Sequence, residues 1–141
     1  MNQLLILHAA ATWFMVGLIW TIQVVHYPLF RNVPESGFIE YERSHTHRMG
    51  ALLVTPAVVE IVTASALVWT RPDGIGLAPV VIAGALLAGI WIMTGAVQAP
   101  IHGHLSAGHD SILIGRLIRT NWWRTSMWSV RGVIAAWMLS A

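Results

Sequence analysis

The chain has 141 residues, of which 56% are hydrophobic and only 10% are charged. Because about 25% of the residues in an ordinary soluble domain are charged, this composition excludes a typical soluble protein and indicates a membrane protein. Cysteine is absent, which excludes disulfides, thiolate metal sites and catalytic thiols. The basic balance, with 8 Lys and Arg against 6 Asp and Glu, indicates membrane orientation rather than nucleic-acid binding in so apolar a chain.

Four apolar segments are each long enough to span a bilayer as a helix, which takes roughly 20 residues for a ~30 Å hydrocarbon core. We therefore predict a single all-α domain, residues 1–141, that forms a four-transmembrane-helix bundle. The N-terminus lacks the basic region of a cleaved signal peptide, so the first segment is expected to be retained. The expected helices span about residues 3–27, 50–70, 77–99 and 120–140.

The segment before the second crossing also shows helical spacing. Phe38, Tyr41, His45 and Arg48 recur every three or four residues, which places them on one helix face. We expect an extended or interfacial helix that begins before the membrane and continues into the crossing. Pro56 is a candidate kink.

The first and third crossings end in related sequences, with Gln23 and Pro28 in one and Gln98 and Pro100 in the other. One interpretation is a tandem repeat of two-helix units, the parallel kind found in membrane proteins. The alternative is a chance recurrence of residues that are common at membrane interfaces. After the third crossing, residues 101–120 are expected to form a loop with a basic lead-in to the last helix.

Arginine placement predicts the orientation. By the positive-inside rule, the first and third connections are cytoplasmic and both termini lie outside, in the cytoplasmic (inner) membrane. The second connection contains Arg71 alone, whereas the other two contain Arg31, Arg43, Arg48, Arg116 and Arg119.

Two ionisable side chains, Glu60 and Arg131, fall near the middle of crossings. Glu60 and Arg131 are both expected ~14 Å from the cytoplasmic face, from a helix rise of 1.5 Å per residue, so they can meet as a buried pair. The pair either locks two helices together or forms the charged floor of a cavity. We take Glu60, Arg131 and Tyr41 as candidate catalytic residues, with Tyr41 or Tyr27 as the carrier of a proton or an electron.

In this topology every histidine except His8 lies on the cytoplasmic side. Imidazoles bind first-row transition metals and haem iron, so a transition metal or haem is the expected cofactor; the alternative is that interfacial histidines are simply tolerated there. Polar residues near the same level would orient the cofactor or the substrate. The candidate metal ligands are His26, His45, His102 and His104, and the candidate orienting residues are Gln23, Gln98, Asn121 and Arg124.

The C-terminal third resembles a family of small four-helix membrane proteins that includes the anthrone oxygenases. The resemblance rests on PIHGHL at residues 100–105 and on NWWRT at residues 121–125, in which Asn121, Arg124 and Thr125 match the family pattern. It implies a lipophilic, electron-rich aromatic substrate and oxygen insertion without an obvious organic cofactor.

The sequence thus predicts a multi-pass membrane oxidoreductase-like protein with a histidine-lined polar site near the cytoplasmic face. It would act on a lipophilic small molecule through a bound metal or haem. An alternative is a non-catalytic subunit or assembly factor of a larger membrane complex that holds a pigment or haem, and another is an ion pathway lined by Glu60 and the inner histidines. Expected partners are membrane lipids, the small molecule, and further copies or subunits, but no nucleic acid.

Overall fold

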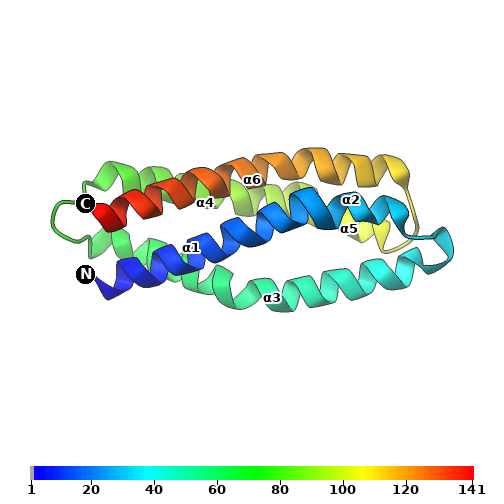
Figure 1. The fold of residues 1–141 in the computed structure, drawn as a ribbon, viewed down its shortest axis with the longest axis horizontal. Coiled ribbons are helices and arrows are strands. Elements are labelled where there is room, and N and C mark those ends of the chain that lie inside the picture. The colour runs from blue at the N-terminus through cyan, green and yellow to red at the C-terminus, as the bar shows by residue number, and fades with distance from the viewer. Residues whose placement is uncertain (1) are drawn as a thin grey trace.

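The computed structural model describes residues 2–141 and shows four long helical segments running side by side (Figure 1). There is no β-strand in this range. The elements in chain order are α1 (Gln3–Thr21), η1 (Ile22–His26), α2 (Tyr27–Leu29), η2 (Phe30–Asn32), α3 (Glu35–Trp69), α4 (Leu77–Met93), η3 (Thr94–Gln98), α5 (Ala99–Leu105) and α6 (Ser111–Ser140).

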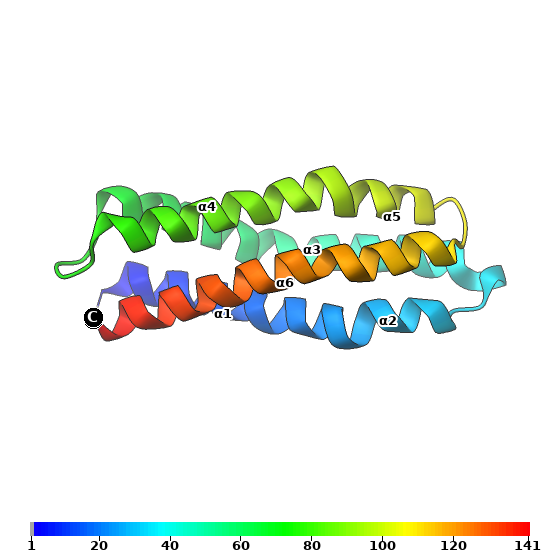
Figure 2. The ribbon, with the colours of Figure 1, turned by 90° about the horizontal axis from the view of Figure 1, so that it is seen from above.

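Both chain ends lie at one end of the bundle, together with the turn between α3 and α4 (Figure 1). The connections from η2 to α3 and from α5 to α6 lie at the opposite end, here called the loop end (Figure 2). The α6 helix packs against α1 and α4, and α1 also packs against α3.

In the part of the chain that the structure describes, three helical segments are long and apolar enough to cross a membrane: Gln3–Asn32, Glu35–Trp69 and Leu77–Leu105. The protein is therefore a helical-bundle membrane protein. The expected fourth crossing falls in α6, which is long enough but less apolar because it carries Arg124 and Arg131.

The last helix begins earlier than predicted. We expected a loop over residues 101–120, yet helix continues to Leu105 and resumes at Ser111. The Asp110 side chain caps α6 by accepting hydrogen bonds from the backbone N–H groups of Ile112 (2.8 Å) and Leu113 (3.0 Å), an N-cap arrangement. The prediction of a loop rested on Gly103, which is helical, and on Gly108, which lies between α5 and α6; the basic lead-in residues Arg116 and Arg119 are on the exposed face of α6.

The predicted helix before the second crossing is confirmed, because α3 runs without interruption from Glu35 to Trp69. Its early turns bury Phe38, Glu42 and His45, which are spaced four and three residues apart and so share one face.

Two π-helical turns, η1 and η3, precede Pro28 and Pro100. In each turn a backbone N–H bonds a carbonyl five residues earlier: Tyr27 to Ile22, and Ala99 to Thr94. Such π-turns insert one residue into a helix, so every later side chain is rotated by about 100°. Uniform helical spacing predicts that residue 26 continues the buried face of α1, but the structure buries Tyr27 and leaves His26 half-buried.

The outer surface of the bundle is apolar. Large hydrophobic side chains such as Val62, Ile92 and Trp123 are more than half exposed. The polar side chains that interrupt the apolar segments are buried instead: His8, Gln23, Glu60, Gln98 and Arg131 are each no more than 2% exposed. Apolar side chains outside and polar side chains inside are the reverse of the arrangement in soluble proteins, and this is expected where lipid surrounds the bundle.

Candidate functional site: a polar cavity at the loop end

A chain of three polar side chains lies at the loop end, contributed by three different elements. The Tyr27 hydroxyl of α2 is 3.0 Å from His102 Nε2 of α5, and His102 Nδ1 is 2.5 Å from Glu42 Oε1 of α3. A carboxylate only accepts hydrogen bonds, so His102 Nδ1 donates to Glu42, which leaves Nε2 to pair with the Tyr27 hydroxyl. Glu42 is fully buried, so this contact sets the tautomer and the orientation of His102.

A pair of histidines lies beside this chain. His26 Nε2 is 2.7 Å from His45 Nδ1, so one imidazole donates and the other accepts. The His45 ring centroid is 5.2 Å from that of His102. Phe30 packs edge-on against both members of the pair. Three of the four predicted metal ligands are therefore brought together.

His104, the fourth predicted ligand, is exposed and points away from this cluster, with its Nδ1 2.7 Å from the Pro100 carbonyl. Residues 102 and 104 both lie in helix α5, and positions two apart on a helix face nearly opposite sides. Tyr41, predicted as a carrier, is half-buried against Phe30, with ring centroids 5.3 Å apart.

The predicted orienting residues form a second polar network one layer deeper. Asn121 Nδ2 donates to Gln23 Oε1 (2.8 Å), and Arg124 Nη1 donates to Asn121 Oδ1 (3.0 Å). Gln98 lies on a separate branch, donating from Nε2 to Thr120 Oγ1 (2.9 Å).

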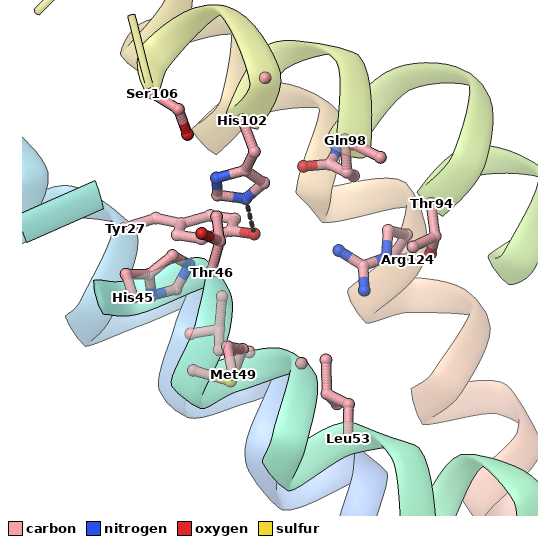
Figure 3. Close-up of a pocket in the computed structure, with 14 residues that line it drawn as sticks. Tyr27, His45, Thr46, Met49, Leu53, Thr94, Gln98, His102, Ser106 and Arg124 are labelled. Atoms are coloured by element: carbon pink, nitrogen blue, oxygen red, sulfur yellow. Dashed lines mark hydrogen bonds between the residues drawn. The ribbon is translucent and has the colours of Figure 1, made fainter. Parts of the chain in front are cut away.

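A cavity of about 460 Å³ lies between these polar groups and α3 (Figure 3). Its rim includes the exposed residues Gly50, Ala99 and Gly103, so it opens at the side of the bundle between α3 and α5. Apolar side chains line one part of the wall, and polar side chains converge on the other. The polar lining includes Tyr27, His45, Gln98, His102 and Arg124, and the apolar lining includes Ile22, Met49 and Leu53.

Two buried atoms of the lining have no hydrogen-bond partner among residues 2–141: Gln98 Oε1 and Arg124 Nε. These side chains are only 2% and 4% exposed. A third atom of this kind, Glu42 Oε2, belongs to the chain that holds His102. Buried polar atoms are normally satisfied, and three of the five unpartnered ones among residues 2–141 gather here, whereas Thr12 Oγ1 and Trp91 Nε1 lie elsewhere.

Glu60 and Arg131 meet as predicted, but in a different layer. Arg131 Nη2 and Nε lie 2.9 and 3.2 Å from Glu60 Oε1, and Trp128 Nε1 donates to Oε2 at 3.3 Å. Arg131 Nη1 donates to the Ala83 carbonyl. Both charged groups are fully paired, and neither lines the cavity.

An apolar layer separates this ion pair from the cavity. Met15, Ile19 and Leu53 surround the space between Arg124 and Trp128, and that space does not accommodate a water molecule. Arg124 lies over the Trp128 ring, 5.4 Å from its centroid. The polar groups therefore form two separate layers, and the packing gives no support to an ion pathway that joins Glu60 to the histidines.

The cavity histidines already satisfy one another or their neighbours. Both nitrogens of His102 are engaged, and each member of the His26–His45 pair uses one nitrogen on the other. In the described chain no group of three or more His, Cys, Asp or Glu side chains is placed to hold a metal ion. As arranged, these residues do not fit a three-ligand metal centre.

The sequence interpretation missed Glu42 and ranked Tyr27 below Tyr41. Glu42 lies three residues before His45 and four after Phe38, so helical spacing could have identified it. The sequence spacing placed Tyr41 rather than Glu42 on the helix face of Phe38 and His45. Tyr27 could not be found by spacing, since the π-turn shifts the buried face by one residue.

Fold and site together define a class: a small helical membrane protein with a side-opening cavity and a buried tyrosine–histidine–carboxylate chain. No protein-family model matches this chain, and neither a curated protein nor a solved structure matches it.

Proposed function

We propose that this protein is a four-crossing membrane protein that binds a lipophilic small molecule in the loop-end cavity and acts on it as an oxidoreductase-like enzyme. The observation that carries the proposal is the cavity itself, about 460 Å³. This volume is within the range of ligand pockets, which combine apolar walls with a few convergent polar groups. Its opening at the side of the bundle suits a molecule that arrives from the lipid.

The proposed fourth crossing is α6. Its Arg124 and Arg131 are buried in the bundle, whereas Val130, Val133 and Trp137 are exposed, so its outward face is apolar despite its charges. Arg31, Arg116 and Arg119 lie toward the loop end, which supports placing that end on the cytoplasmic side of the inner membrane, with both termini outside.

The tandem-repeat interpretation belongs to the same proposal. The first and third segments each contain a π-helical turn followed by a proline, and each buries a glutamine from that turn. This recurrence of backbone irregularity supports a repeat of two-helix units more strongly than the residue identities do.

Proton transfer is the part of the chemistry that this chain's residues can perform. Glu42 holds His102 in one tautomer, and His102 in turn accepts from the Tyr27 hydroxyl, which lines the cavity. A carboxylate–imidazole pair of this kind lets a hydroxyl deliver or take a proton at a bound molecule. Tyr27 is therefore the proposed contact with the reacting group, and Glu42 is a positioning residue.

A metal or haem would supply redox chemistry, but the clustered histidines already hydrogen-bond to one another, to Tyr27 and to Glu42. A cofactor remains a prediction. Elemental analysis and an absorption spectrum of the purified protein check it, and a colourless, metal-free protein with full activity would contradict it.

A non-catalytic subunit is the second candidate. An apolar groove between α3 and α4, lined by small residues including Ala64, Gly84 and Ala88, is the kind of surface on which membrane helices pack closely. A partner or a second copy that co-purifies at fixed stoichiometry, with no small molecule in the cavity, would favour this role.

Filling the cavity tests the proposed function. Gly103 lines it, and a side chain added there meets no atom within 4 Å, so Gly103→Leu should fold normally while occupying the site. We expect a lipophilic molecule to co-purify with the wild-type protein and to be reduced at least about tenfold in the variant, as extraction and mass spectrometry would show.

Gly17→Leu is the matched control for this test. Gly17 is also helical and exposed, and a Cβ added there meets no atom within 4 Å, but it does not line the cavity. Equal amounts of bound molecule in Gly103→Leu, Gly17→Leu and wild-type protein would contradict binding in the cavity.

A further inference from the structure

We infer that the cavity selects apolar molecules whose polar head is a hydroxyl group, as in a lipophilic phenol or alcohol. This inference deepens the proposed function and rests on it. It follows from the two unpartnered atoms of the lining, Gln98 Oε1 and Arg124 Nε, whose hydrogen-bonding characters are opposite.

The orientation of the Gln98 amide is set by Thr120. The Thr120 hydroxyl donates to the Arg116 carbonyl (2.8 Å), so it can only accept from Gln98. The Gln98 NH2 group must therefore face Thr120, as observed at 2.9 Å, and the amide oxygen is left for the cavity. That oxygen requires a donor.

A chain of amides fixes Arg124 in the same way. Gln23 Nε2 donates to the Ile118 carbonyl (3.2 Å), which directs Gln23 Oε1 to Asn121 Nδ2 (2.8 Å). Asn121 Oδ1 therefore faces Arg124 and accepts from Nη1 (3.0 Å). Arg124 is held by this contact and by Trp128, while its Nε–H is left without an acceptor.

A head group that satisfies both atoms must donate to Gln98 and accept from Arg124. A hydroxyl does both, since it has one O–H and two lone pairs. A ketone or ether accepts only and leaves Gln98 Oε1 unsatisfied. A carboxylate would suit Arg124 but bring a negative charge toward the Gln98 oxygen and toward Glu42, whose Oε2 is also unpartnered.

The rest of the cavity fits an apolar body. Ile22, Met49 and Leu53 line it, and the rim residues Gly50, Ala99 and Gly103 are small and exposed. A hydroxyl held at Gln98 and Arg124 thus leaves the apolar part of the molecule free to extend toward the lipid.

The test compares four probes by equilibrium binding to the full-length protein in lipid nanodiscs, with empty nanodiscs as the reference. They are 4-octylphenol, dodecan-1-ol, 4-octylanisole and 4-octylbenzoic acid. We expect 4-octylphenol or dodecan-1-ol to bind roughly tenfold more tightly than the methyl ether and the acid, the effect of one buried hydrogen bond. The comparison of 4-octylphenol with dodecan-1-ol decides whether the preferred hydroxyl group is phenolic or aliphatic.

Gln98→Met removes the acceptor at similar side-chain size, and Gln3→Met, at the exposed N-terminal end, is its matched control. The affinity ratio of the tighter-binding hydroxyl probe to 4-octylanisole should fall to near one in Gln98→Met and stay near ten in Gln3→Met. The ratio within each variant is the readout, so a change in stability alone does not move it.

The outcomes separate the two proposals. If all four probes bind equally and Gly103→Leu weakens them all, the cavity binds ligands but the hydroxyl preference is overturned. If Gly103→Leu changes none of them, the cavity is not their site and the proposed function fails with the inference. An unchanged ratio in Gln98→Met also overturns the hydroxyl preference, even if the phenol binds tightly.

Discussion

Replacing Arg131 by methionine should lower the free energy of unfolding by about 3–5 kcal/mol, because it leaves the Glu60 carboxylate buried without its cation. Glu60 is fully buried and receives two hydrogen bonds from Arg131, at 2.9 and 3.2 Å. The measurement is equilibrium unfolding in detergent micelles, followed by circular dichroism.

The double variant Glu60→Gln/Arg131→Met separates lost charge pairing from lost packing. It removes both charges, keeps an acceptor for the Trp128 N–H, and should recover most of the stability lost in Arg131→Met. Arg119→Met, at an exposed position of the same helix, should change stability by no more than about 0.5 kcal/mol. If the free energy of unfolding fell equally in Arg131→Met and in the double variant, the unpaired Glu60 charge would not be the cause of the lost stability.

The second large effect is expected at His102. His102→Ala should cost about 2–3 kcal/mol of stability, because the fully buried Glu42 carboxylate loses its partner at 2.5 Å. It should also abolish conversion of the bound molecule, since Tyr27 loses its acceptor. Unfolding measurements and an assay of the molecule that co-purifies with the wild-type protein check the two effects.

His104→Ala is the matched control for this prediction. His104 lies two residues away in the same helix, is exposed, and hydrogen-bonds to the Pro100 carbonyl, so its removal should leave stability within about 0.5 kcal/mol of wild type. The double variant Glu42→Gln/His102→Ala should regain stability without regaining conversion. If His102→Ala and His104→Ala behaved alike, the tyrosine–histidine–carboxylate chain would have no role.

The predicted site could be identified in part from spacing within single segments. His26, His45 and His102 come together, and so do Gln23, Asn121 and Arg124. These residues are polar and occur where the chain is otherwise apolar, and a membrane interior requires such groups to find partners. The pairing of Glu60 with Arg131 could be predicted from the sequence for the same reason, because either charge alone in the membrane interior would cost free energy.

The hydrogen-bond partners of the buried polar side chains could not be predicted, because a partner depends on the rotation of one helix against another. Glu42 reaches His102 across two segments that are far apart in the chain. His104 is predicted with His102 because both lie at the cytoplasmic end of the third crossing, whereas continued helix in α5 turns His104 away. The loop expected over residues 101–120 from Gly103 and Gly108 was wrong for most of its length, because helix continues through Gly103 to Leu105 and resumes at Ser111.

The sequence by itself determined that this is an α-helical membrane protein with polar groups buried at intervals along its apolar segments. Composition and segment length decide this, since a bilayer admits few structures that satisfy the backbone. Only the tertiary structure decided that Tyr27 rather than His26 continues the buried face of the first segment, that Glu42 orients His102, and that Gln98 and Arg124 face one cavity. A π-helical turn before a proline changes the helical phase by one residue, and no regular periodicity in the sequence records that change.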